Sequence, residues 1–170
     1  NYYNVIRGGS DIFYYMPGQR YFVAFSNLFF GDTSFGYLII TSLLPIIFYI
    51  FFQKYLNKKY ALILFAFFIF FPIFENLGFG YFNYIHQMIR NHSETLSITL
   101  ILISLIYVID LDKLNGKKIT NITLISVGFI LAFAALLRPN FFLTTSCIII
   151  FSTLTLIIKK RYLNIFYLLI

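Results

Sequence analysis

The chain has 170 residues, of which 60% are hydrophobic and 11% are charged, and its mean hydropathy is +0.84. This composition excludes an ordinary soluble domain, because one core of this size cannot bury so much apolar surface, and it favours a membrane protein. The net charge of +7 would favour nucleic-acid binding in a soluble protein, but here it comes mostly from lysine clusters that orient a membrane chain, so we expect no nucleic-acid partner.

The first 34 residues are predicted to form an outer loop followed by a short juxtamembrane helix. The helix is expected over Pro17–Phe30, because proline suits the first helical turn and Gly31-Asp32 stops a helix. The segment is too short to cross a membrane and too apolar for open water. We therefore place it in the outer membrane interface.

Residues 35–170 are predicted to hold the membrane spans. The first, Phe35 to Phe52, contains 18 residues without a charge, which at about 1.5 Å per residue roughly covers a hydrocarbon core of about 30 Å. Four further spans are expected at Tyr60 to Phe74, Thr95 to Ile109, Ile119 to Leu137 and Phe141 to Ile158. Tyr162 to Ile170 begins a sixth, truncated span, and the chain starts without methionine, so we expect a piece of a longer protein. The predicted fold is an all-α polytopic transmembrane helix bundle in a single membrane domain.

Residues 75–94, between two predicted spans, are interpreted as a second interfacial stretch. Its aromatic residues favour the headgroup layer: Phe79, Tyr81, Phe82 and Tyr84. It also carries His86 and His92, whose separation puts them on different helix faces and matches no standard metal-ligand pattern. We therefore predict no metal centre from these residues.

The basic residues alternate by type between successive gaps. All eight lysines fall in three clusters, at residues 54–59, 113–118 and 159–160, and the intervening gaps hold arginine instead. Cytoplasmic loops collect lysine and arginine, so the lysine clusters are placed in the cytoplasm. Arg7, Arg20, Arg90 and Arg138 then lie on the extracytoplasmic face.

Most side chains able to bind anions or transfer protons share that outer face. It holds four of the five arginines, both histidines and four of the six acids. Arg20 and Arg138 are the predicted phosphate ligands, because the planar guanidinium gives paired hydrogen bonds to phosphate oxygens. Arg20 also lies in the first turn of the predicted juxtamembrane helix, where free amides favour an anion. The secondary members of the predicted site are Arg90, Glu75 and His86.

The order of these features resembles that of the membrane glycosyltransferases of the GT-C class. The resemblance rests on residues 11–22 (DIFYYMPGQRYF), on Phe30-Gly31 before the first span, on Glu94 at the mouth of a span, and on Leu137-Arg138-Pro139 at an outer helix end. It is closest to the protein mannosyltransferase and lipid A aminoarabinose transferase branch, and covers the chain from about Arg7 to Arg138.

The resemblance implies transfer of a sugar from a polyprenyl-phosphate carrier to a lipid, glycan or protein acceptor. The reaction would take place at the extracytoplasmic face of a bacterial inner (plasma) membrane. It implies Asp11 and Glu94 as carboxylates for proton transfer or acceptor orientation, with arginine stabilising the leaving phosphate. In that family the main aspartate commonly has an acidic neighbour, which Asp11 lacks, so the main base is expected either at Asp11 or upstream of Asn1. No cofactor is assigned, although some relatives use a divalent metal ion.

Three alternatives remain open at this point. Arg20 is as well explained by snorkelling to water or by pairing with Asp11. A transporter or flippase would place charges at mid-depth within its spans, and none of the five predicted spans carries one. An O-antigen polymerase or ligase would also use outer arginines on anionic substrates.

Overall fold

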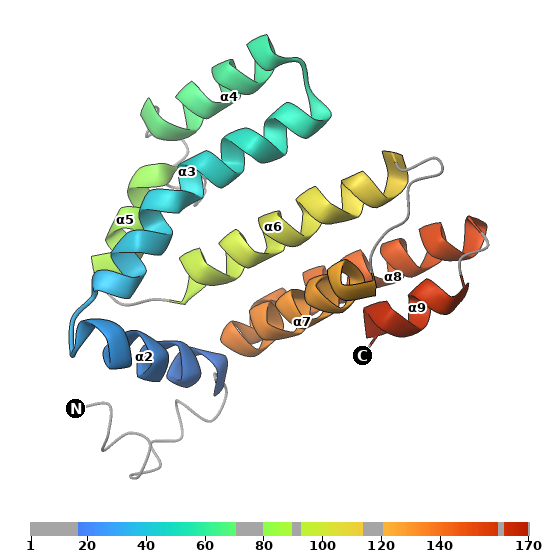
Figure 1. Ribbon diagram of the computed structural model, residues 1–170. Helices are drawn as coiled ribbons and strands as arrows, with labels where there is room; N and C mark the ends of the chain where they lie inside the picture. The colour runs from blue at the N-terminus through green and yellow to red at the C-terminus, as the bar shows by residue number, and fades with distance from the viewer. Residues whose placement is uncertain (1–16, 71–79, 90–92, 114–120, 160–161, 170) are drawn as a thin grey trace.

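The computed structural model describes residues 17–70, 80–89, 93–113, 121–159 and 162–169 (Figure 1). Throughout these ranges the chain is helical, with short turns and no strand. The all-α prediction is therefore confirmed for the described part of the chain.

Successive long helices run in opposite directions (Figure 1). In chain order the elements are α2 (Pro17–Phe30), α3 (Phe35–Tyr55), α4 (Lys58–Phe70), α5 (Tyr81–Ile89), α6 (Glu94–Lys113), α7 (Asn121–Leu137), the 3-10 helix η3 (Pro139–Phe141), α8 (Phe142–Ile158) and α9 (Tyr162–Leu169). α3, α6 and α8 end on the side where α4, α7 and α9 begin. The described lysines flank the ends of α3, α6 and α8 and consequently lie at one end of the bundle. The starts of α2 and α6 lie at the other end, which we call the arginine end.

Two helical segments within the described residues are long and apolar enough to cross a membrane: Phe35–Tyr55 and Pro139–Ile158. α4 has 13 residues and α7 has 17, which correspond to about 20 Å and about 26 Å of helix against a hydrocarbon core of about 30 Å. The described helices thus meet the length requirement for two spans. The full set of five spans stays a prediction.

The turn between α2 and α3 explains why α2 ends where its sequence indicates. Gly31 adopts a φ of 69°, a left-handed conformation that glycine tolerates without steric cost, and its N–H donates to the Asn27 carbonyl at 3.0 Å. The Thr33 hydroxyl then donates to the Phe30 carbonyl at 3.0 Å and accepts from the Phe35 N–H at 3.4 Å. These local bonds reverse the chain into α3 within four residues.

α7 lies at the centre of the described helices and packs against α2, α6, α8 and α9, while α3 packs against α4, α5 and α6. Each of these two helices organises one apolar cluster. Leu124 and Leu131 of α7 are fully buried in the first, and Leu44 and Phe48 of α3 lie in the second. α6 contributes side chains to both clusters and so joins the two halves.

Small and hydroxyl-bearing residues bring these helices close together. The buried residues of α6 include four of this type, and Ser93 just before the helix is a fifth: Thr95, Ser97, Thr99 and Ser104 lie within it. The Ser97 and Thr99 hydroxyls donate to the carbonyls four residues earlier, at 3.1 and 2.7 Å, which satisfies buried polar groups within the helix itself. On α7, a Cβ at Gly128 would collide with the Leu168 carbonyl of α9. Close approach through small residues is typical of helix packing in membranes.

Candidate functional site

The starts of α2 and α6 meet the end of α7 at the arginine end of the bundle (Figure 1). Gly18 is buried, and a Cβ added to it would lie 2.8 Å from both the Leu136 carbonyl carbon and the Leu137 nitrogen. Only glycine therefore lets the first turn of α2 lie directly on the backbone of α7. Arg20 follows two residues later and is held beside the helix end that precedes Arg138.

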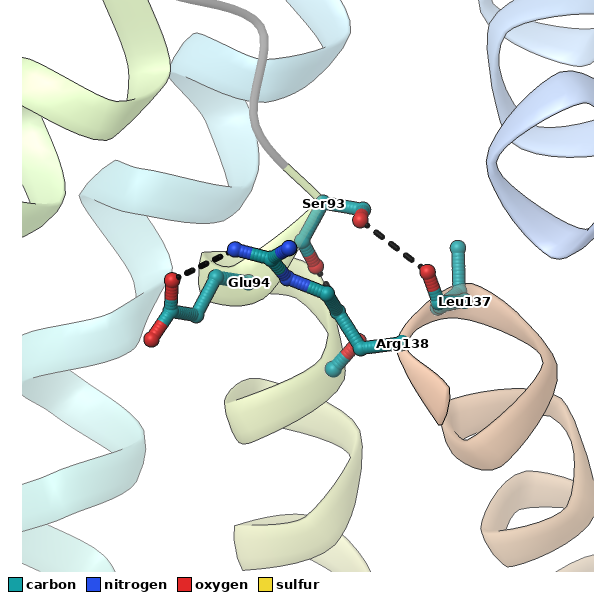
Figure 2. A network of polar contacts seen from close by, with 5 residues as sticks. Ser93, Glu94, Leu137 and Arg138 are labelled. Carbon is teal, nitrogen blue, oxygen red and sulfur yellow. Dashed lines mark hydrogen bonds and ion pairs between the residues drawn. The ribbon is translucent and has the colours of Figure 1, made fainter. Parts of the chain in front are cut away.

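Arg138 and Glu94 form an ion pair across this end of the bundle (Figure 2). Nη2 of Arg138 lies 2.9 Å from Oε2 of Glu94, and the two side chains are 20% and 32% exposed. Glu94 is in the first turn of α6 and Arg138 directly follows α7. Each charge therefore lies at the helix end whose dipole favours it.

A hydrogen bond from Ser93 to Leu137 lies next to the ion pair (Figure 2). The buried Ser93 hydroxyl donates to the Leu137 carbonyl at 3.1 Å, which satisfies one of the carbonyls left open at a helix end. The Ser93 carbonyl accepts the Ser97 N–H at 3.0 Å and so starts α6. Ser93, Glu94, Leu137 and Arg138 together form what we call the α6–α7 clasp.

Tyr84 of α5 is a neighbour of the clasp that the sequence did not indicate. The side chain is buried and its ring centroid lies 6.1 Å from that of Phe68. Burial, together with the negative charge of Glu94, raises the pKa of Tyr84 to about 12. Sequence reasoning treated it as one interfacial aromatic among several, because no spacing rule relates it to Glu94 across residues 90–92.

Two guanidinium nitrogens of Arg20, Nε and Nη2, are shielded from solvent. The Arg20 side chain as a whole is half-buried, and snorkelling and pairing with Asp11 both stay predictions. Pairing with Asp11 involves a residue outside the described part of the chain. Asp11, Glu75 and Arg90, three of the predicted site residues, all lie outside it.

His86 is exposed on α5, with its ring centroid 5.7 Å from that of Phe82. No contact to the clasp is recorded for it among the described residues, so its membership of the site stays a prediction. The described part of the chain also holds no group of three His, Cys, Asp or Glu side chains that could bind a metal ion.

Comparison of the chain with protein-family models, with curated proteins and with solved structures found no match. Arg20, Glu94 and Arg138 were predicted to share one face, and the structure places all three at one end of the bundle. The sequence assigned Glu94 to a carboxylate role and Arg138 to phosphate binding, and in the structure the two side chains form an ion pair. The pair uses Nη2 of Arg138 and lowers the net positive charge that an anion would meet there.

Proposed function

We propose that this protein is an integral membrane protein with α2 in the outer interface. The orientation of α2 supports this, because its polar side chains Gln19, Arg20, Ser26 and Asn27 are buried or half-buried. Its exposed large apolar side chains lie on another face of the helix: Tyr21, Phe25, Leu28 and Phe29, with Leu28 82% exposed. A helix with its apolar face outward matches a lipid environment and not water.

α8 supports the same proposal at a second place. Together with η3 it forms a 20-residue apolar segment, and it leaves large apolar side chains exposed along its whole length: Phe142, Leu143, Ile150, Phe151 and Ile158. A water-soluble bundle would bury such a face or break it with charges. We assign α8 and α3 as full spans of the proposed polytopic bundle, with the lysine end in the cytoplasm.

We further propose that the arginine end transfers a sugar from a polyprenyl-phosphate carrier to a hydroxyl acceptor. The observation that carries this proposal is the Gly18 contact, which brings Arg20 to the same helix end as the Arg138–Glu94 pair. An isoprenoid tail is confined to lipid and its phosphate to the boundary. Two arginines at one boundary provide the charge and the paired donors that a phosphate needs.

In the proposed mechanism, binding of the sugar donor breaks the ion pair and so frees the catalytic base. A carrier phosphate that takes the guanidinium of Arg138 releases the carboxylate of Glu94, which can then accept a proton. The acceptor hydroxyl oxygen attacks the anomeric carbon while its proton passes to the carboxylate. The bond from that carbon to the phosphate oxygen breaks, and the arginines stabilise the charge that grows on the leaving phosphate. Asp11 is the second candidate for the base.

The test is a transfer assay with the full chain in lipid vesicles and a radiolabelled polyprenyl-phosphate sugar as donor. Arg20→Ala and Arg138→Ala are each expected to lower transfer at least a hundredfold while membrane insertion is unchanged, since each removes a donor that stabilises the transition state. Lys58→Ala removes one positive charge at the opposite end of the bundle and serves as the matched control. Full activity in both arginine variants would remove the phosphate role.

A further inference from the structure

A small polar recess lies between the end of α2 and the start of α3, at the arginine end of the bundle. Its volume is about 70 Å³, and its lining includes Ser26, Asn27, Asp32, Ser34 and Tyr37. At about 30 Å³ per water molecule, this is room for roughly two waters or for one polar edge of a larger ligand. We call it the α2–α3 recess.

The α2–α3 recess is lined by a buried polar side chain, that of Ser26. This side chain is only 5% exposed, and its hydroxyl has no hydrogen-bond partner among the described residues. The hydroxyl fits closely against Gly36, where a Cβ would collide with it. A buried hydroxyl without a partner is destabilising by about 1–3 kcal/mol, so the Ser26 hydroxyl would gain a hydrogen bond by turning from Gly36 towards a ligand in the recess.

The other polar groups of the recess differ in whether they already make hydrogen bonds within the protein. The Thr33 hydroxyl donates to Phe30 and accepts from Phe35 within the turn. Ser34 makes no side-chain cap bond at the start of α3, and Asp32 is exposed at the rim. The hydroxyls of Ser26 and Ser34 and the Asp32 carboxylate are therefore among the groups that can meet a ligand.

This set of groups selects among ligand classes. A carboxylate only accepts hydrogen bonds, whereas a serine hydroxyl both donates and accepts. A neutral ligand hydroxyl can donate to Asp32 and accept from Ser26, while a phosphate would be repelled by the Asp32 charge. A metal cation would find a single carboxylate beside the positive end of the α3 dipole, which opposes it.

The α2–α3 recess also lies at a suitable distance from the proposed phosphate ligands. Ser26 follows Arg20 by six residues on one helix, or about 9 Å along its axis. We propose that the α2–α3 recess holds a hydroxyl-bearing edge of the sugar whose phosphate is bound at the arginine end. This inference rests on the proposed function and adds to it the part of the chain that recognises the sugar.

The experiment measures binding of two kinds of lipid to the full chain in nanodiscs. The probes are decaprenyl phosphate and decaprenyl phosphates that carry a hexose, a pentose or an amino sugar. Ser26→Ala should weaken the tightest sugar lipid by about threefold to tenfold, the effect of one hydrogen bond, and leave decaprenyl phosphate unchanged. Ser34→Trp, which fills the recess from its rim, should do the same more strongly. Ser126→Ala, at an exposed position on α7, is the matched control.

The outcomes separate this inference from the proposed function. If only Ser26→Ala and Ser34→Trp lose the preference for sugar-bearing over bare decaprenyl phosphate, the α2–α3 recess is supported as the sugar site. Equal affinity of the wild type for bare and sugar-bearing lipids, or an equal effect of Ser126→Ala, overturns the recess while the phosphate site stands. Failure of every decaprenyl lipid to bind overturns both.

Discussion

The guanidinium of Arg138 lies 2.9 Å from the carboxylate of Glu94 and so connects the end of α7 to the start of α6. The two residues are 44 positions apart in the chain, and the Ser93–Leu137 hydrogen bond beside them closes the same contact. Because both charges complement their helix dipoles, the pair stabilises the two helix ends and their mutual position at once. The first prediction concerns that stabilisation.

A double-mutant cycle with Glu94→Gln and Arg138→Gln should give a coupling energy of about 0.5–1 kcal/mol, typical of a partly exposed ion pair. The measurement is the free energy of unfolding in mixed micelles titrated with denaturing detergent. The same cycle on Lys58→Gln and Glu94→Gln, which lie at opposite ends of the bundle, should give no coupling. Additive effects of the two clasp substitutions would mean that the pair contributes nothing to the fold.

Gly18→Ala should displace the first turn of α2 from α7, since the added methyl group would meet backbone atoms at 2.8 Å. Overpacking of this kind costs about 1–3 kcal/mol, and under the proposed function it also moves Arg20 away from Arg138. We expect a lower unfolding midpoint together with reduced sugar transfer. Ala24→Ser, at an exposed position of the same helix, should change neither. An unaltered midpoint in Gly18→Ala would show that α2 does not rest on α7 through this residue.

The Tyr84 phenol should lose its proton only at high pH, because burial and the charge of Glu94 raise its pKa to about 12. Absorbance at the tyrosinate band should show a component near that pH that disappears in Tyr84→Phe and moves to lower pH in Glu94→Gln. Below pH 10 the phenol is neutral in both the folded and the unfolded chain. Between about 10 and about 12 the unfolded chain loses its proton first, so the stability from this group falls as the pH rises through that window. Tyr107→Phe is the control, because this phenol is exposed.

The outward face of α2 can be tested with spin labels in a Cys147→Ala background, since Cys147 is the chain's single cysteine. A label at Leu28 should be relaxed by oxygen, which concentrates in lipid, more than by a water-soluble nickel complex. A label at Lys58 should show the reverse preference. Nickel accessibility at Leu28 equal to that at Lys58 would contradict the placement of α2 in the membrane interface.

The helix boundaries were predictable wherever the signal is local. α2 begins at Pro17 and ends at Phe30 as predicted, because a proline at one end and a glycine with a φ of 69° at the other act through their own backbones. The alternating direction of the helices also follows the alternation of lysine and arginine gaps. α4, with 13 described residues, shows where composition alone fails to establish a span.

The contacts within the site were not predictable to the same degree. Sequence patterning brought Arg20, Glu94 and Arg138 to one end, but the 2.9 Å contact depends on how α6 and α7 rotate against each other, and packing determines that rotation. The approach of α5 to Glu94 likewise depends on tertiary structure. The α2–α3 recess depends on the turn at Gly31 and on the absence of a side chain at Gly36.

Helix α6 belongs to both apolar clusters, with Ile101 and Val108 in the cluster around α7 and the adjacent Leu102 in the cluster around α3. Loss of either cluster would remove packing from one side of α6 and so weaken the helix that also holds the other cluster. Denaturation of the described helices should consequently be concerted, with one transition seen by every spectroscopic probe. Because Ile101 and Leu102 are neighbours in the chain, disorder of α6 at this point would disturb both clusters at once.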